Sequence, residues 1–168
     1  MTQTREMRLK DREITDPAEI KSILDDCAIC RLGFSEGGVP YVLPMNYGYT
    51  YEGGVITLFF HSAGLGRKID IINANPTVCF EIDSEHRLDP DERPDRSSVK
   101  WESLVGSGTL EYVNDFQEKR LMLGNMIRKY RRHNSLYKPN PLTDDRVDGV
   151  TMFRLTLDEF KAKREYHL

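Results

Sequence analysis

The residues that decide the fold read AICRLGFSEGGVPYVLPMNYGYTYEGGVITLFFH and occupy positions 28–61. Within them, three runs rich in β-branched and aromatic residues are separated by two short turns, Glu36-Gly37-Gly38 and Glu52-Gly53-Gly54. The pattern predicts strands over 28–35, 41–51 and 55–61. Because a parallel pair needs a long crossover connection, we expect strands joined by such tight turns to pair antiparallel.

The segments on either side supply further strands and a few helices. We expect a helix that begins at Asp16 and helices over 67–74 and 115–133, together with strands over 77–83, 99–113 and 149–157. The long strand either continues through Gly106-Ser107-Gly108 or divides there. Six or so strands with few helices indicate a mainly β fold with flanking helices, namely a closed or nearly closed antiparallel barrel. Phe116, Leu123, Ile127 and Tyr130 share one face of the longest helix, and we expect this face to join the core.

The composition is that of a single globular domain. The chain has 168 residues, of which 39% are hydrophobic and 30% charged, and we expect one domain over 1–168 with an N-terminal arm (1–14) and a charged tail (158–168). A net charge of −3 implies no nucleic-acid partner. The longest apolar run, 55–60, is too short to cross a membrane. Residues 1–10 lack the apolar centre of a secretory signal, so the expected location is the cytoplasm.

Three cysteines, Cys27, Cys30 and Cys79, cannot all pair with one another. The first two spell C-x-x-C, which would suit a redox dithiol or half of a zinc site. A redox dithiol begins a helix after a strand, however, and here the order is reversed. A zinc site would need two more ligands at suitable spacing, which the sequence does not provide. The favoured interpretation is therefore a pair of buried, inert thiols and no metal site.

Two charged segments have structural interpretations. The acidic, proline-containing stretch 85–96 is either a solvated loop or a lid or dimer flap. The basic end of the long helix, Arg128-Lys129-Tyr130-Arg131-Arg132, complements the helix dipole and requires no nucleic acid.

The densest cluster of functional residue types is Phe59-Phe60-His61-Ser62-Ala63-Gly64-Leu65-Gly66-Arg67-Lys68. Here a strand ends, a small-residue loop turns, and a helix begins with two cations. Cations at a helix N-terminus oppose the helix dipole, whereas a bound anion would explain them. Free backbone N–H groups, a serine hydroxyl, an arginine fork and a lysine together describe a phosphate site. The alternative is an ion pair between Arg67 and Asp70, three residues further on.

Two other segments are weaker candidates. The interrupted strand Val42-Leu43-Pro44-Met45-Asn46-Tyr47-Gly48 offers unpaired backbone groups and an amide against which a planar heteroaromatic ring could lie, or it is an edge strand with a bulge. Trp101-Glu102-Ser103 opens the long strand, and its tryptophan belongs to the core, to an interface or to a site.

Taken together, these motifs resemble the nitroimidazole-resistance (Nim-type) proteins of the pyridoxamine 5'-phosphate oxidase-like, FMN-binding split-barrel superfamily. The resemblance runs from about residue 5 to residue 154. It rests on Met7-Arg8-Leu9-Lys10-Asp11-Arg12-Glu13-Ile14, Cys30-Arg31-Leu32-Gly33-Phe34, Pro44-Met45-Asn46-Tyr47-Gly48-Tyr49, Phe60-His61-Ser62-Ala63, Gly66-Arg67-Lys68-Ile69-Asp70 and Trp101-Glu102-Ser103-Leu104-Val105-Gly106-Ser107-Gly108.

The resemblance implies a homodimer of split β-barrels with FMN at the subunit interface. In that pattern Ser62, Arg67 and Lys68 hold the FMN phosphate. Pro44, Met45, Asn46 and Tyr47 line the isoalloxazine ring, with Asn46 as a hydrogen-bonding partner for its polar edge, and His61 faces either phosphate or ring. Trp101, Glu102 and Ser103 approach the cofactor across the dimer interface. FAD in place of FMN stays open.

The leading hypothesis for function is a flavin oxidoreductase in which FMN accepts a hydride from NADH or NADPH and passes electrons to a small acceptor such as a nitro-aromatic. No residue is assigned as a catalytic acid or base. A second hypothesis is a non-enzymatic flavin-binding or sensing protein. A third is a haem-binding split barrel, for which His61, His86, His133 and His167 are the potential axial ligands.

Overall fold

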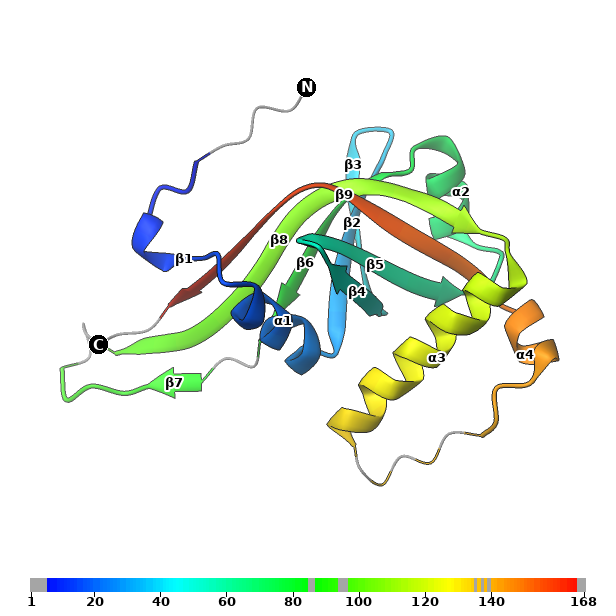
Figure 1. The fold of residues 1–168 in the computed structure, drawn as a ribbon. Coiled ribbons are helices and arrows are strands. Elements are labelled where there is room, and N and C mark those ends of the chain that lie inside the picture. Colours follow the sequence, from blue (N-terminus) through cyan, green and yellow to red (C-terminus); the bar gives the residue numbers. More distant parts are fainter. Residues whose placement is uncertain are drawn as a thin grey trace.

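In a computed structural model, a mainly antiparallel sheet curls around one core and carries helices on its outside (Figure 1). The structure describes residues 6–84, 87–93, 97–134, 136, 138 and 140–165. Its helices are η1 (a 3-10 turn, Lys10–Arg12), α1 (Pro17–Asp26), α2 (Arg67–Ala74), α3 (Phe116–His133) and α4 (Asp144–Asp148). Its strands are β1 (Glu13–Ile14), β2 (Ile29–Glu36), β3 (Val39–Asn46), β4 (Gly48–Glu52), β5 (Val55–Ser62), β6 (Thr77–Asp83), β7 (Arg87–Asp89), β8 (Ser98–Val113) and β9 (Thr151–Glu165). None of the described helices is long and apolar enough to span a membrane.

The sheet closes on itself through the chain rather than through a hydrogen-bonded ladder. Its strand order is β3-β2-β6-β8-β9-β5-β4, with β1 beside β9 and β7 beside β8, and each of these pairs is antiparallel. The two strands at the ends of that order, β3 and β4, are consecutive in the chain and separated only by Tyr47. The chain therefore crosses from one edge of the sheet to the other in a single step, which produces a nearly closed barrel, as predicted.

This crossing corrects the predicted strand over 41–51, which is two strands that pair with different neighbours. β3 pairs with β2, in which Arg31 faces Pro44, and β4 pairs with β5, in which Phe59 faces Gly48. Pro44 does not interrupt its strand, because β3 lies at an edge where a missing N–H leaves no ladder bond unmade. Gly48 is required where it is, because a Cβ there would lie 2.2 Å from a ring carbon of Phe59.

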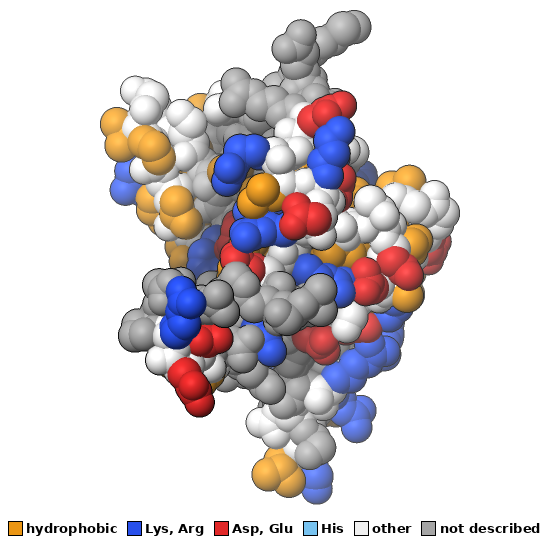
Figure 2. All heavy atoms as spheres, turned by 90° about the vertical axis from the view of Figure 1, so that its left-hand side faces the viewer, with side chains coloured by type: hydrophobic (Ala, Val, Ile, Leu, Met, Phe, Trp, Pro, Cys, Tyr) orange, Lys and Arg blue, Asp and Glu red, His pale blue; other side chains and the backbone are white. Residues whose placement is uncertain are grey.

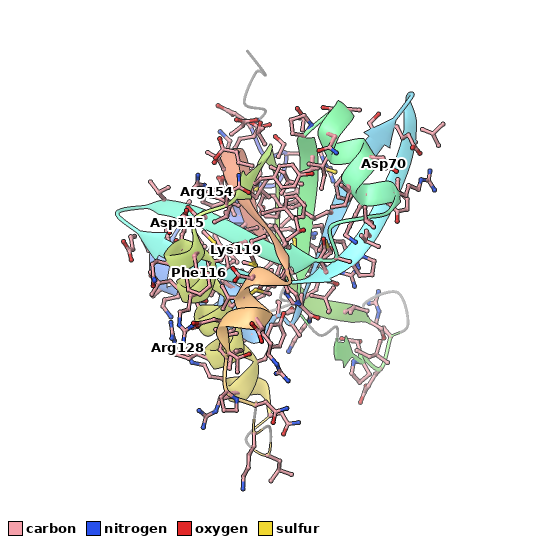
Figure 3. All side chains as sticks on the ribbon, turned by 90° about the vertical axis from the view of Figure 1, so that its right-hand side faces the viewer. Asp70, Asp115, Phe116, Lys119, Arg128 and Arg154 are labelled. Carbon is pink, nitrogen blue, oxygen red and sulfur yellow. The ribbon has the colours of Figure 1, made fainter. Side chains whose placement is uncertain are left out.

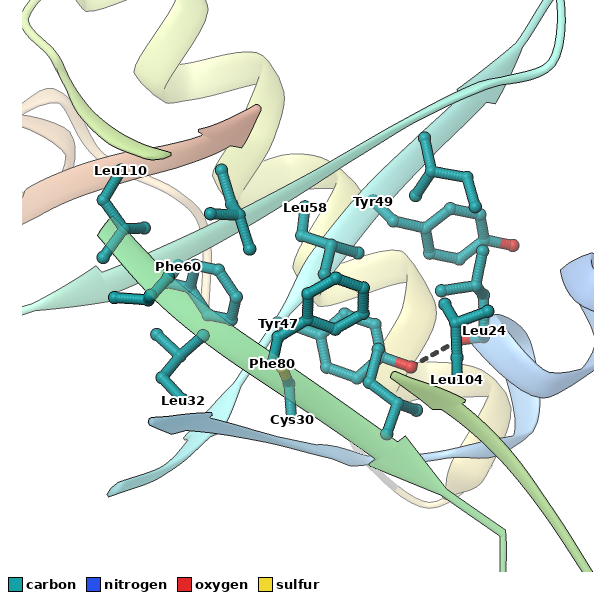
Figure 4. Packing of buried hydrophobic residues seen from close by; sticks show 14 of the residues in the cluster. Leu24, Cys30, Leu32, Tyr47, Tyr49, Leu58, Phe60, Phe80, Leu104 and Leu110 are labelled. Atoms are coloured by element: carbon teal, nitrogen blue, oxygen red, sulfur yellow. Dashed lines mark hydrogen bonds between the residues drawn. The ribbon is translucent and has the colours of Figure 1, made fainter. Parts of the chain in front are cut away.

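The core fills the barrel with aromatic and branched side chains (Figure 4). Helix α1 closes one end of it with Ile20, Ile23 and Leu24, and all three are buried. The Tyr47 side chain, 0% exposed, crosses the core, and its hydroxyl contacts the carbonyl oxygens of Leu24 (2.9 Å) and Cys27 (3.0 Å). This phenol therefore joins the closing segment of the barrel to the C-terminal end of α1.

The two longest strands, β8 and β9, pair with each other along nearly their whole length. β8 and β9 pair from Trp101↔Glu165 to Val113↔Met152, with a register shift between Ser107 and Gly108. The long strand thus continues through the glycine segment by means of a bulge. A Cβ on Gly106 would lie 2.2 Å from the carbonyl oxygen of Glu159, so only glycine allows this approach.

Helix α3 packs on the outside of the sheet against β4 and carries α4 beside it (Figures 1 and 3). Its N-terminus is capped by Asp115, whose carboxylate accepts the N–H of Glu118 at 2.8 Å. Arg154 of β9 holds the same end by an ion pair with Glu118 (2.7 Å). Leu123 and Met126 of α3 form a second buried cluster with Phe59, Val147 and Met152.

Two predictions about the ends of the chain need correction. The expected charged tail over 158–168 continues strand β9 as far as Glu165, because its charges meet partners on neighbouring elements: Lys161 pairs with Glu13, Arg164 with Glu19 and Glu165 with Arg12. The expected arm over 1–14 is bound to the sheet from Lys10 onward through η1 and β1.

Two further segments differ from the prediction in secondary structure. Part of the acidic stretch 85–96 forms β7, which pairs with the start of β8, while residues 85, 86 and 94–96 lie outside the described residues. Helix α4 was not predicted, because three aspartates in five residues give it no apolar periodicity.

Candidate functional site

The predicted phosphate segment connects β5 to α2 at the molecular surface. Helix α2 begins without a side-chain cap, after Gly66 at φ 112°. Its first hydrogen bonds are donated by Ile69 and Asp70 to the Gly66 carbonyl, at 2.8 and 3.3 Å. The N–H groups of Arg67 and Lys68 thus have no hydrogen-bond partner among the described residues. Two free donors and two cations therefore lie at one helix start, and such groups bind phosphate elsewhere. Ser62 precedes this helix by five residues, and its hydroxyl donates to the Ala63 carbonyl at 2.7 Å.

Arg67 does not pair with Asp70, the alternative considered from the sequence. Its guanidinium instead donates to Glu36 in the β2–β3 turn, from Nε at 2.9 Å and Nη2 at 2.7 Å. It also lies over the Tyr41 ring, 4.4 Å from the ring centroid. Both side chains of the ion pair are about half exposed, so the pair contributes little to stability. A phosphate ester could therefore displace Glu36 at small cost, and the residues present fit a phosphate group.

In the second predicted segment, successive side chains of β3 point alternately to solvent and toward the core. The Pro44 and Asn46 side chains are exposed, whereas Met45 is half-buried and packs against the core. Tyr47 is fully buried, and its N–H donates to the Tyr130 hydroxyl at 2.9 Å. Its phenol is committed to carbonyl groups inside the barrel, so the Tyr47 side chain does not face an external ligand. Of these four residues, Pro44 and Asn46 present side chains to an external ligand.

Asn46 and His61 meet at a pocket that the sequence did not reveal as a whole. The pocket has a volume of about 780 Å³, within the range of small-molecule sites. It lies between the ends of β3 and β5 and the inner faces of α3 and α4. Its lining is mostly apolar and consists of Asn46, His61, Leu123, Met126, Ile127, Tyr130, Asn134, Leu142, Arg146, Gly149 and Val150.

Hydrogen bonds to neighbouring residues of the barrel orient two polar groups of this pocket, those of Tyr130 and Asn46. The Tyr130 hydroxyl donates to the carbonyl of Ala28 at 2.7 Å, and Asn46 forms a side-chain hydrogen bond with the same hydroxyl. Burial raises the pKa of Tyr130, which stays a neutral phenol at physiological pH. Desolvation lowers the pKa of His61, so its ring favours the neutral form. The pocket can therefore offer a neutral imidazole and an oriented amide to a ligand.

Trp101, Glu102 and Ser103 lie away from these residues. They stand at the start of β8, at the opposite end of the molecule from the end of β5 (Figure 1). Trp101 lines a separate hollow of about 780 Å³ beside η1, and Lys163 lies 5.0 Å from its ring centroid. Ser103 is buried, and Glu102 lies 3.7 Å from Arg164. On the described part of this face, Lys and Arg side chains interleave with Asp and Glu (Figure 2). Within one chain, these three residues do not join the others.

Two of the three cysteines are buried, as predicted. Cys27 and Cys30 are 3% and 0% exposed, and neither forms a disulfide. Burial raises the pKa of Cys27 to about 12 and raises that of Cys30 as well. Both therefore stay protonated and unreactive at neutral pH. Among the described residues, no three His, Cys, Asp or Glu side chains gather in a way that could hold a metal ion.

Sequence reasoning missed the wall that α3 and α4 contribute to the pocket. The apolar stripe of α3 was predicted as core, and Leu123 is buried accordingly, but Ile127 and Tyr130 also face the pocket. A core stripe and a pocket wall have the same helical spacing, so the pattern could not separate them. His86, His133 and His167, named as potential haem ligands, have no described side chain, which leaves His61 as the histidine that the structure places at a site.

Comparison with known proteins supports this fold. Residues 16–164 match the family described as pyridoxamine 5'-phosphate oxidase. A candidate 5-nitroimidazole antibiotic resistance protein from Bacteroides thetaiotaomicron is 29% identical, with a TM-score of 0.74 over 90% of this chain and 86% of that chain. A search of curated proteins gave no significant match.

Two more distant structures share the architecture. An FAD-binding protein from Mesorhizobium loti is 22% identical, with a TM-score of 0.59 over 90% of this chain and 96% of that chain. An FAD and heme binding protein from Mycobacterium smegmatis is 14% identical, with a TM-score of 0.73 over 93% of this chain and 74% of that chain. These likenesses confirm the predicted mainly antiparallel split barrel.

Proposed function

The chain belongs to the pyridoxamine 5'-phosphate oxidase family, as the sequence resemblance predicted, and from this membership we propose that it is an FMN-binding oxidoreductase. When bound, FMN would supply the hydride chemistry, accepting two electrons from NADH or NADPH for transfer to a small acceptor. A nitro-aromatic is the favoured acceptor class, because a structure 29% identical to this chain is that of a candidate 5-nitroimidazole resistance protein. The protein itself would bind and orient the cofactor and shield the acceptor from water.

The observation that carries the proposal is that an apolar pocket and a phosphate-type loop follow one another at the end of strand β5. His61 lines the apolar pocket, and the next residue, Ser62, begins the loop with the two free N–H donors. A flavin mononucleotide needs the same pair of environments, since it joins a doubly charged phosphate to a planar, largely apolar ring system. A site for phosphate alone would not need the pocket, and a site for an uncharged ring would not need the loop.

At the phosphate end, Ser62, Arg67 and Lys68 would hold the anion together with the N–H groups at the start of α2. Gly66 allows the close approach, because a Cβ built on it would meet nothing within 4 Å, so the space above its backbone is open. Glu36 would give up Arg67 when phosphate binds.

At the ring end, Pro44 and Asn46 would lie along one face or edge of the isoalloxazine. The Asn46 amide, held by Tyr130, would form a hydrogen bond with the polar edge of the ring. The neutral His61, which lines the pocket, could donate or accept a hydrogen bond there without adding charge. The apolar wall from α3 would exclude water from the acceptor.

We propose further that the site is completed by a second copy of the chain. The phosphate loop and the outer face of β3 are open to solvent, and Leu65 and Val42 beside them are 85% and 60% exposed. Trp101 and Glu102 would then reach the cofactor of the partner, which would account for their distance from it within one chain, whereas the buried Ser103 would approach it through its backbone. Sedimentation should give twice the mass of one chain, and a monomer that still binds FMN would contradict this part of the proposal.

Turnover tests the function itself. The FMN-loaded protein should oxidise NADH or NADPH in the presence of a nitro-aromatic at a rate well above that of free FMN. Stoichiometric flavin binding without turnover by either nicotinamide would favour the non-enzymatic flavin protein. A Soret band in the purified protein would instead favour the haem-binding hypothesis, with His61 as the candidate axial ligand among the described residues. Release of FAD rather than FMN on heating would change the cofactor but not the site.

A further inference from the structure

Among its described lining residues, the acceptor pocket carries one formally charged side chain, which is basic, and no acidic one. Of its lining residues, Arg146 is the one with a permanently charged side chain, and neither Asp nor Glu is among them. Asn46, His61, Tyr130 and Asn134 supply neutral polar groups, and the remaining lining is apolar apart from backbone. No carboxylate among the described lining residues balances the positive charge that Arg146 brings to the pocket.

The Arg146 side chain makes no polar contact with the rest of the described protein. Within the residues that the structure describes, its guanidinium forms no ion pair and no hydrogen bond. Arg120 provides the contrast in the same region, since it pairs with Asp144 and ties α4 to α3. A structural role for Arg146 would require a similar partner.

The helix that carries Arg146 is nevertheless anchored. Val147 is 0% exposed and packs in the second buried cluster with Phe59 and Met126. The Gly149 N–H ends the helix by donating to the Asp145 carbonyl at 2.9 Å. The backbone of Arg146 is therefore held beside the pocket by its buried neighbour, and its side chain lies free at the pocket wall.

We propose that the pocket accepts a small aromatic molecule that carries one carboxylate, and that Arg146 determines this specificity by pairing with it. A guanidinium matches a carboxylate in shape as well as charge, because its fork can donate two parallel hydrogen bonds. The apolar residues of α3 would cover the ring of the same molecule. This inference rests on the proposed function, since it treats the pocket as the acceptor site.

Two matched probes test the proposal. 4-Nitrobenzoate and 4-nitrobenzamide have nearly the same size and differ by one negative charge, and calorimetric titration measures the binding of each without turnover. For an exposed ion pair at a pocket mouth, the wild type should bind the benzoate about tenfold more tightly than the amide at low salt. Arg146→Gln should remove this preference, and Arg146→Lys should keep part of it, because it keeps the charge and loses the fork.

Arg131→Gln provides the control, because it removes an exposed arginine from the nearby end of α3 that does not line the pocket. It should leave the preference unchanged. The proposal is overturned if the wild type shows no preference, if neither probe binds, if Arg146→Gln keeps the preference, or if Arg131→Gln loses it equally.

Flavin content, measured separately by absorbance, keeps the two proposals distinct. A protein that binds no FMN refutes the proposed function, and titration of the same protein as purified still decides the role of Arg146. A loss of FMN affinity in Arg146→Gln with an unchanged benzoate preference would assign Arg146 to the cofactor and overturn the present inference.

Discussion

Replacing Lys129 with methionine should change how stability depends on pH. Lys129 is 4% exposed, and its ammonium donates to the Cys27 carbonyl and lies 4.1 Å from the centroid of the Tyr47 ring. Burial lowers its pKa from 10.5 to about 8. Methionine keeps the length of the side chain and removes the charge, while the Tyr47 hydroxyl remains as a donor to the Cys27 carbonyl.

The sign and size of the effect follow from these two pKa values. Below pH 8 the amine is protonated in both folded and unfolded chains, so it adds no pH dependence. Between pH 8 and 10.5 the unfolded chain binds the proton that the folded chain has lost, so the contribution of Lys129 to stability rises with pH. Integration from pH 7 to pH 9 gives an increase of about 1.3 kcal/mol in the free energy of unfolding.

The difference between wild type and variant isolates this effect. Cys27 and Cys30, whose pKa values are raised by burial, act in the opposite direction above pH 8.5 but are present in both proteins. Urea unfolding at pH 7, 8 and 9 should show the wild type gaining about 1.3 kcal/mol relative to Lys129→Met. Lys119→Met, a half-exposed position on the same helix, should change stability equally at each pH. Parallel pH profiles for wild type and Lys129→Met would refute the reasoning.

Three further substitutions test the packing of the barrel. Tyr47→Phe should cost about 1–2 kcal/mol, because it removes the hydroxyl that contacts two buried carbonyls. Tyr51→Phe, for which no hydroxyl hydrogen bond is described, should cost much less, and equal losses in urea unfolding would be inconsistent with the role given to Tyr47. Gly106→Ala should lower the free energy of unfolding by more than about 3 kcal/mol, because its Cβ would lie 2.2 Å from the Glu159 carbonyl oxygen. Near-normal thermal stability of this variant would contradict the close approach of β9 to β8 at this glycine. Gly124→Ala in α3 should instead stabilise by about 0.5–1 kcal/mol, since its Cβ meets nothing closer than 3.5 Å, and calorimetry should show the rise in melting temperature.

Local sequence signals predicted most of the fold. The glycine turns at 36–38 and 52–54 and the helix start at Asp16 each specify structure within a few residues, and each appears where expected. The break at Tyr47 could not be predicted in this way. It depends on carbonyls of α1 that are 20 and 23 residues away in sequence. The strand in the charged C-terminal segment was missed for the same reason, because its charges are neutralised by distant partners.

The candidate site was predictable where its residues are consecutive and unpredictable where the fold brings them together. Ser62, Arg67 and Lys68 form one loop and helix start, so their spacing alone indicates a phosphate site. The pocket joins Asn46 and His61 to α3 and α4, which begin 55 or more residues further along the chain. Arg146 has no local signal at all, because an arginine among aspartates is typical of a solvated helix.

The central claim is that this chain holds the phosphate of FMN at the start of α2, and a flavin titration tests it most directly. FMN and riboflavin differ only by that phosphate, and visible difference spectra measure the binding of each. We predict one FMN per chain, bound at least tenfold more tightly than riboflavin, with this preference reduced about tenfold or more in Arg67→Ala and in Lys68→Ala. Equal affinity for the two flavins, or a preference that survives both substitutions, would contradict the account.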